Sequence, residues 1–145
     1  MTTDSALVSP ATTTATAISI LLVDDSPSFL GILARFLGKQ FADEVIILGT
    51  ALGGEEALTK FQALRPDVVL LDLVMPGLSG LETIPRLCRL SREVGIVAMT
   101  LWGTDAYRQA AYAAGADAFV SKDALATDLL PAIRRAKDCH RGGGR

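Results

Sequence analysis

Three aspartates, a threonine and a lysine stand at or near the ends of apolar stretches, and together they suit metal-dependent phosphoryl chemistry. Asp24 and Asp25 follow the first such stretch, Asp72 the third and Thr100 the fourth, and Lys122 comes shortly after the fifth. Carboxylates are ligands that Mg²⁺ prefers, and a carboxylate can also attack a phosphoryl group. A hydroxyl and an ammonium can hold phosphoryl oxygens. Each residue alone fits a cap, a strand end or a surface charge, but their shared position indicates a site.

The elements that must position these residues alternate along the chain. The apolar stretches are rich in Val, Ile and Leu without alternation, which predicts strands buried on both faces of a parallel sheet. Segments with helical spacing separate them, so we expect five βα units and an α/β doubly wound fold with helices on both faces. The carboxyl ends of such strands line one crevice, where ligands bind. The predicted strands are 18–23, 45–48, 68–71, 94–99 and 116–120.

Capping and breaking residues set the expected helix limits. Ser26 caps a first helix that begins at Pro27 and runs to about residue 38, and a second helix spans 54–64. A third follows Gly80, with Pro85 in or near its first turn, and a fourth spans 104–114. The last helix is expected to begin near Thr127, because Pro131 should lie in its first turn.

Composition limits the class of protein. The chain has 145 residues, and we expect a disordered leader over 1–17, one domain over 18–138 and a flexible tail over 139–145. A net charge of −2 argues against direct nucleic-acid binding by this chain, and its late basic residues suit a helix C-terminus instead. No apolar run approaches the ~20 residues that span a bilayer, so we expect no membrane association and a cytoplasmic location.

The chain resembles the receiver domains of bacterial two-component response regulators over residues 18–137. The resemblance rests on Leu-Leu-Val-Asp-Asp-Ser at 21–26, Leu-Leu-Asp-Leu-Val-Met-Pro-Gly-Leu-Ser-Gly at 70–80, Thr100, and Gly-Ala-Asp-Ala-Phe-Val-Ser-Lys-Asp at 115–123. Ser-Lys-Asp-Ala and the later Leu-Leu-Pro-Ala-Ile-Arg-Arg are similar to receivers that precede LuxR-type helix-turn-helix domains. The resemblance implies a flavodoxin-like strand order of 2-1-3-4-5.

The resemblance also implies roles for the site residues. Asp72 would accept a phosphoryl group from a sensor histidine kinase or a phosphotransfer protein. Asp25 would bind Mg²⁺ directly with support from Asp24, and Asp72 and the backbone carbonyl of Val74 would complete the protein ligands. Thr100 and Lys122 would contact the phosphoryl oxygens. Such a protein is no metabolic enzyme, although it catalyses its own aspartyl phosphorylation and dephosphorylation.

Signalling would follow from a shift between two packings of one surface. Phosphorylation would draw Thr100 inward and let Phe119 turn into the space behind it. The surface formed by the fourth helix, fifth strand and fifth helix would then control an output partner or domain, and a phosphorylation-dependent homodimer is plausible. Phe119 lacks the hydroxyl of tyrosine, so no outward hydrogen bond should hold its exposed rotamer. Plain core packing is the alternative for Phe119.

Three residues are expected to tune access to the site. Val74 is apolar and cannot orient a water molecule by hydrogen bonding, and Leu101 follows Thr100 where many family members have a smaller residue. Trp102 lies next in a loop, as a partner anchor or as incidental exposure. Together the three suggest slow self-dephosphorylation.

Alternatives remain at the level of function. A haloacid-dehalogenase-type phosphohydrolase also forms an aspartyl phosphate, but it needs an aspartate where Val74 stands. A phosphate-independent receiver-like binding module is the other alternative, although all five expected site residues are present. About ten residues follow Arg135, so both a stand-alone receiver and a regulator truncated before a DNA-binding domain fit the sequence.

Overall fold

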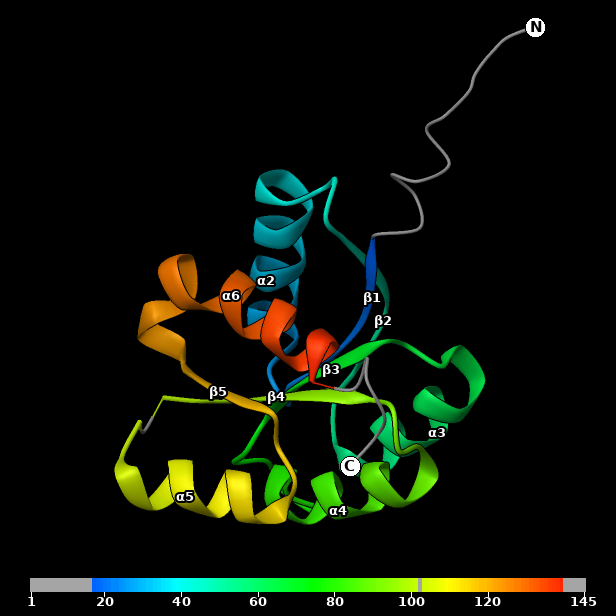
Figure 1. Cartoon of the computed structure of the whole chain (residues 1–145), viewed down its shortest axis with the longest axis vertical. Helices are drawn as coiled ribbons and strands as arrows, with labels where there is room; N and C mark the ends of the chain where they lie inside the picture. The colour runs from blue at the N-terminus through cyan, green and yellow to red at the C-terminus, as the bar shows by residue number, and fades with distance from the viewer. Residues whose placement is uncertain (1–16, 102, 140–145) are drawn as a thin grey trace, which may run out of the picture.

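A five-stranded parallel sheet with helices on both faces forms the body of the computed structural model, which describes residues 17–101 and 103–139 (Figure 1). The strand order is β2-β1-β3-β4-β5, which confirms the predicted flavodoxin-like fold. The elements are β1 (Ile18–Val23), α2 (Pro27–Gln40), β2 (Val45–Ala51), α3 (Gly54–Leu64), β3 (Val68–Asp72), α4 (Gly80–Leu90), β4 (Gly95–Thr100), α5 (Asp105–Ala114), β5 (Ala118–Ser121), the 3₁₀ turn η1 (Lys122–Ala124) and α6 (Leu125–Asp138).

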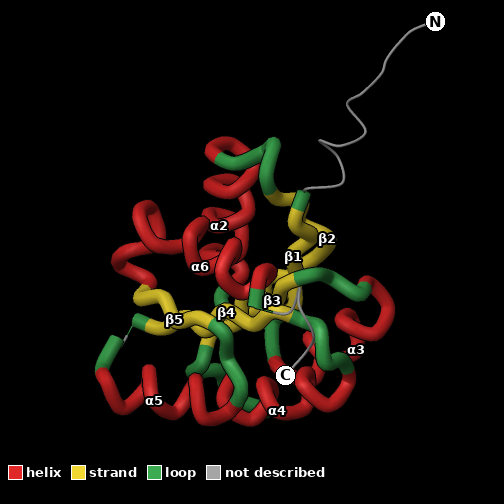
Figure 2. Tube along the Cα trace, in the orientation of Figure 1, coloured by secondary structure: helices red, strands yellow, loops and turns green. Residues whose placement is uncertain are grey.

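The sheet separates two apolar clusters. Helices α2 and α6 cover one face, and α3, α4 and α5 cover the other (Figure 1, Figure 2). In β1, Ile20 and Leu22 pack towards the first group of helices, whereas Leu21 and Val23 pack towards the second. All four side chains are fully buried. Burial of each such side chain contributes about 1.5–3 kcal/mol, so the central strands form a rigid base for the residues at their ends.

Polar caps begin the helices that follow β1 and β3. The Ser26 hydroxyl accepts the N–H of Phe29 at 3.2 Å, and Pro27 occupies the first position of α2. At α4, the Ser79 hydroxyl accepts the N–H of Glu82 at 3.2 Å, while the Glu82 carboxylate accepts the N–H of Ser79 at 3.1 Å. Each cap satisfies N–H groups that have no partner inside the helix, which fixes where the helix starts relative to the strand before it.

Several predicted element limits were wrong. Strand β2 continues to Ala51, and β5 begins at Ala118 rather than at residue 116. Helix α6 begins at Leu125, so Pro131 lies in its second turn and not in its first, and Pro85 likewise lies inside α4. Each proline removes one helical hydrogen bond. In α6 this cost is offset by the burial of Leu129 and Ile133 on either side of Pro131.

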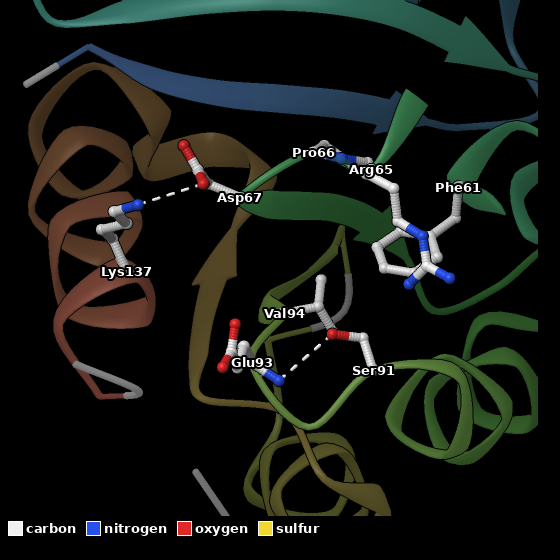
Figure 3. A pocket seen from close by; sticks show the side chains of 8 residues that line it. All are labelled: Phe61, Arg65, Pro66, Asp67, Ser91, Glu93, Val94 and Lys137. Atoms are coloured by element: carbon white, nitrogen blue, oxygen red, sulfur yellow. Dashed lines mark hydrogen bonds and ion pairs between the residues drawn. The ribbon is translucent and has the colours of Figure 1, made fainter. Parts of the chain in front are cut away.

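Asp67 connects three elements at the end of the sheet where β3 begins. Its Oδ2 accepts the N–H of Ser19 at 3.0 Å, and its own N–H donates to the Ser19 hydroxyl at 2.8 Å. Its Oδ1 lies 3.0 Å from the Lys137 ammonium on α6 (Figure 3). Partial burial acts to raise the pKa of Asp67, but the Ser19 N–H and the Lys137 ammonium outweigh it and hold the pKa below its ordinary value. The carboxylate is therefore more stable in the folded chain than in the unfolded chain.

This arrangement predicts a pH-dependent contribution to stability. Because the folded-state pKa is the lower one, the contribution is present above the unfolded-state pKa of about 4 and is lost as the pH falls through the folded-state value. Asp67→Asn should lower the free energy of unfolding by about 1 kcal/mol at pH 6, a figure reduced for solvent screening. Urea unfolding from pH 6 down to pH 3 should show the two proteins converge. Asp43→Asn, at an exposed position, should show no such difference, and a constant gap at Asp67 would contradict the prediction.

Candidate functional site

The predicted site residues meet at the carboxyl ends of the strands. A hollow of about 270 Å³ opens there between the ends of β1, β3, β4 and β5. Its lining includes all five residues singled out as a phosphoryl site, together with two of the three expected to tune access. The lining residues are Asp24, Asp25, Ser26, Asp72, Val74, Thr100, Leu101 and Lys122.

Three carboxylates gather in this hollow. One oxygen from each of Asp24, Asp25 and Asp72 can be chosen so that all three atoms lie within 4.8 Å of one another. Asp24 and Asp72 are buried, and Asp25 is exposed. Three anionic oxygens this close repel one another in a low-dielectric setting. The donor set is hard and all oxygen, so these residues fit a divalent cation of the Mg²⁺ type.

The ammonium of Lys122 lies among the same carboxylates. Its Nζ is 2.5 Å from Asp24 Oδ2 and 3.4 Å from Asp72 Oδ2, and the lysine side chain is only 11% exposed. The Nζ also lies 4.3 Å from the centre of the Phe29 ring on α2. A single positive charge thus offsets part of the negative charge of the cluster.

The residue that caps α2 holds Asp24 in place. Its Oδ1 accepts the N–H of Ser26 at 2.9 Å, so the two oxygens of this buried carboxylate have separate partners. Ser26 also caps the helix through its hydroxyl. The start of the helix therefore orients the carboxylate that in turn orients Lys122. Sequence reasoning recognised Ser26 as a cap but missed this second contact, which its position two residues after Asp24 could have indicated.

Asp72 ends β3 in an environment that disfavours its charge. Burial raises the pKa of Asp72, the nearby Lys122 charge lowers it in part, and Asp24 raises it further, so that the pKa lies above its ordinary value. The N–H of Val74 donates to Asp72 Oδ1 at 3.2 Å, while Oδ2 faces Lys122. The Val74 N–H and the Lys122 ammonium thus orient the two oxygens of Asp72, and the negative charge of this carboxylate favours a cation beside it. A carboxylate held in this way suits nucleophilic attack.

Thr100 and two apolar side chains complete the hollow. Thr100 is fully buried at the end of β4. Leu101 is 64% exposed and Val74 is 46% exposed, so both lie at the rim. The prediction made for Trp102 falls outside the described residues. The rim of the hollow is therefore apolar where the floor is charged.

Phe119 lies apart from this hollow. It is half-buried on β5, and it packs against the cluster on the α3, α4 and α5 side of the sheet. The guanidinium of Arg108 on α5 lies 4.9 Å from the centre of its ring. The two line a separate hollow of about 230 Å³ that reaches Asp128 and Arg135 of α6. Sequence reasoning missed Arg108, because nothing in the local pattern joins it to Phe119.

A hollow of about 300 Å³ lies at the opposite end of the sheet, and it has a different character (Figure 3). Its lining mixes acidic and basic side chains, and the labelled Asp67 and Lys137 are joined as an ion pair. The ion pair between Asp67 and Lys137 already links β3 to α6, and the carboxylates of this lining are not among those that gather closely enough to hold a metal ion.

Two of the late basic residues are paired with acidic ones. Arg134 lies 2.5 Å from a carboxylate oxygen of Glu44, and Lys137 is paired with Asp67. These contacts hold α6 to the loop before β2 and to the start of β3. Within the described ranges, none of the helices has the length and apolar character needed to cross a bilayer.

The family model and the related sequences that match this chain point to the same family. The model of the family described as "Response regulator receiver domain" matches residues 20–134. Over 117 residues the chain is 36% identical to the response regulator GacA of Pseudomonas viridiflava, covering 81% of this chain and 54% of that protein. Over 118 residues it is 34% identical to the nitrate/nitrite response regulator protein NarL of Escherichia coli K12, covering the same shares. The chain thus spans about half the length of these curated relatives.

Comparison with solved structures gives the same fold. A two-component response regulator of the LuxR family from Aurantimonas sp. SI85-9A1 is 26% identical, with a TM-score of 0.79 and coverage of 86% of this chain and 88% of that one. The chemotaxis protein CheY4 of Vibrio cholerae is 30% identical, with a TM-score of 0.72 and coverage of 83% and 98%.

Proposed function

The chain belongs to the family of response regulator receiver domains, and from this premise we propose that Asp72 is the phosphoryl acceptor of a signalling switch. The donor is a sensor histidine kinase or a phosphotransfer protein, and the reaction depends on Mg²⁺. The observation that carries this proposal is the hollow in which the buried Asp72 lies beside two further aspartates and a lysine.

Asp24, Asp25, Asp72 and the backbone carbonyl of Val74 are the groups that would hold Mg²⁺. When bound, the ion offsets the negative charge of the acidic cluster and of the incoming phosphoryl group. The close approach of the three carboxylates supports this assignment, because the single charge of Lys122 offsets only part of their negative charge.

The transfer itself needs few protein groups. A carboxylate oxygen of Asp72 forms the new bond to phosphorus, and the P–N bond of phosphohistidine breaks, with the imidazole leaving and taking a proton. Lys122 donates a hydrogen bond to one phosphoryl oxygen, and the Thr100 hydroxyl donates to another. The haloacid-dehalogenase route is not favoured, because Val74 supplies no carboxylate two residues after Asp72.

Phosphorylation then changes the surface formed by α5, β5 and α6. Thr100 and Phe119 lie on neighbouring strands β4 and β5, which supports a link between the acceptor and this surface. We propose that the surface controls an output partner or domain, with a phosphorylation-dependent homodimer as one form of that control. We also propose residues 18–138 as the receiver unit and the cytoplasm as the place where it acts.

The apolar rim bears on the lifetime of the phosphorylated state. Val74 and Leu101 are both exposed at the mouth of the hollow, and neither can orient an attacking water molecule. The phosphorylated protein should therefore lose its phosphoryl group slowly. Its lifetime can be measured by phosphorylating the protein, removing the phosphodonor and following the remaining adduct over time.

The direct test uses acetyl phosphate as the donor, because it needs no kinase. In the presence of Mg²⁺, the intact mass of the wild type should increase by one phosphoryl group, and EDTA should prevent the increase. Asp72→Asn should show no adduct, since an amide cannot form the acyl phosphate. Asp43→Asn, which alters an exposed aspartate outside the hollow, should react as the wild type does.

Two outcomes would contradict the proposal. An adduct of equal yield on Asp72→Asn would place the acceptor elsewhere. A wild type that neither reacts nor binds beryllium fluoride would instead support the alternative, a phosphate-independent binding module.

A further inference from the structure

The ring of Phe29 covers one side of the Lys122 ammonium. Phe29 lies in the first turn of α2 and is half-buried, and it packs against the apolar cluster between the sheet and the α2 and α6 helices. Its ring centre is 4.3 Å from Lys122 Nζ, which is within the range of a cation–π contact. The attraction is larger when the charge is removed from water, as it is for this lysine.

The contacts of the ammonium divide into two kinds. Asp24 Oδ2 at 2.5 Å and Asp72 Oδ2 at 3.4 Å attract it towards the acidic cluster, and the Phe29 ring lies against it as an apolar surface that still favours positive charge. Lysine has a flexible four-carbon stem, so its ammonium needs such neighbours to stay at one point.

We propose that Phe29 is a positioning residue for the phosphoryl transfer, holding the Lys122 ammonium against the place where a phosphoryl oxygen binds. When the phosphoryl group binds, the Lys122 ammonium must exchange a hydrogen bond to a carboxylate for one to a phosphoryl oxygen. The Phe29 ring occupies one side of the ammonium, so no water molecule can compete for a hydrogen bond there during this exchange. This inference rests on the proposed function, and it adds Phe29, to which the sequence motifs assigned no role in the site.

Phe36 offers a matched comparison on the same helix. It is also a half-buried phenylalanine of α2, and it packs against the same apolar cluster. Its ring partner is Phe41, with centroids 5.6 Å apart in an edge-to-face arrangement. Replacement of either phenylalanine removes apolar packing, but only replacement of Phe29 removes the contact with Lys122.

The test measures the rate of phosphorylation by acetyl phosphate at fixed Mg²⁺. Phe29→Leu should lower the rate roughly three- to tenfold, as the loss of a partly desolvated cation–π contact predicts. Phe29→Tyr keeps the ring face and should restore the rate to within about twofold. Phe36→Leu should leave it unchanged within the same limit, and thermal unfolding of all variants separates this effect from loss of folded protein.

Two further readouts do not depend on packing alone. In a Lys122→Met background, Phe29→Leu should cause no additional loss of rate, because the residue it positions is gone. In NMR spectra of the unphosphorylated protein, the ε-methylene protons of Lys122 should resonate upfield, and Phe29→Leu should remove this ring-current shift while Phe36→Leu keeps it.

The outcomes that would overturn the role of Phe29 differ from those that would overturn the role of Asp72. A wild-type rate in Phe29→Leu, equal losses in Phe29→Leu and Phe36→Leu, or the same loss in the Lys122→Met background would each overturn the positioning role while Asp72 remains the acceptor. Absence of any adduct on the wild type would overturn the proposed function, and with it this role.

Discussion

Gly80→Ala is expected to lower the free energy of unfolding by about 3 kcal/mol and to slow phosphorylation by at least tenfold. A Cβ at this position would overlap the carbonyl oxygen of Asp72 and would lie 2.6 Å from the Cα of Leu73. Both are backbone atoms, so no side chain can move aside. The N–H of Gly80 also donates to the carbonyl of Leu73 at 3.1 Å. Helix α4 therefore begins directly against the residue that we propose as the acceptor.

The two effects can be separated by other glycine substitutions. Gly95→Ala should also be destabilising, because its Cβ would lie 2.8 Å from the carbonyl carbon of Ala136 on α6. Gly95 lies at the start of β4, away from the acidic hollow, so the folded fraction of the Gly95→Ala protein should react at the wild-type rate.

Gly38→Ala should have the opposite effect on stability. The added Cβ meets no atom within 4 Å and replaces a helical glycine, so the substitution should raise the free energy of unfolding by about 0.5–1 kcal/mol.

Urea unfolding gives the stabilities, and the rate of adduct formation per folded molecule gives the effect on the site. Wild-type stability in Gly80→Ala would contradict the close approach of α4. If Gly80→Ala were destabilised but reacted at the wild-type rate, the displacement of α4 would not affect the reaction of Asp72, and the predicted effect on the rate would be wrong.

The sequence allowed the fold and the members of the site to be predicted, for one physical reason. In a parallel sheet the carboxyl ends of all strands lie along one edge, so residues such as Asp72 and Thr100 share that edge once the strands are recognised, and the strand order that the resemblance implied makes β3 and β4 neighbours. Buried strands are recognised from their continuous apolar content, as in β3, where every residue is buried. This prediction requires neither the register between the strands nor the exact residues at which each strand begins and ends.

The contacts that depend on packing between distant elements could not be predicted. Phe29 fits the apolar spacing of its helix, and only the relative placement of α2 and the end of β5 brings it to Lys122. The same holds for Arg108 and Phe119. Pro131 was misplaced because the rule for isolated helices ignores the burial of neighbours such as Leu129 and Ile133, which holds the helix intact across a missing hydrogen bond.

Lys122→Met should lower the rate of phosphorylation by roughly 10²–10³, because it removes a charged donor aimed at the phosphoryl oxygens. It should also destabilise the protein in EDTA by about 3 kcal/mol, since the buried carboxylates of Asp24 and Asp72 lose their paired cation. Mg²⁺ should restore more stability to this variant than to the wild type, because the acidic cluster then has no internal cation. Thermal unfolding across a Mg²⁺ titration, beside the acetyl phosphate assay, measures both effects.

Lys60→Met is the matched control. Lys60 forms an ion pair with Glu56 at 3.2 Å and donates to the carbonyl of Thr50 at 2.6 Å, but the paired side chains are exposed and lie outside the acidic hollow, so its loss should cost about 1–2 kcal/mol and should leave the rate unchanged. The comparison separates two roles of Lys122. If Lys122→Met lost stability in EDTA yet reacted at the wild-type rate, the lysine would serve only to neutralise the buried carboxylates. A rate loss that persists at saturating Mg²⁺, where the ion already neutralises them, is the result expected from the contact between the ammonium and the phosphoryl group.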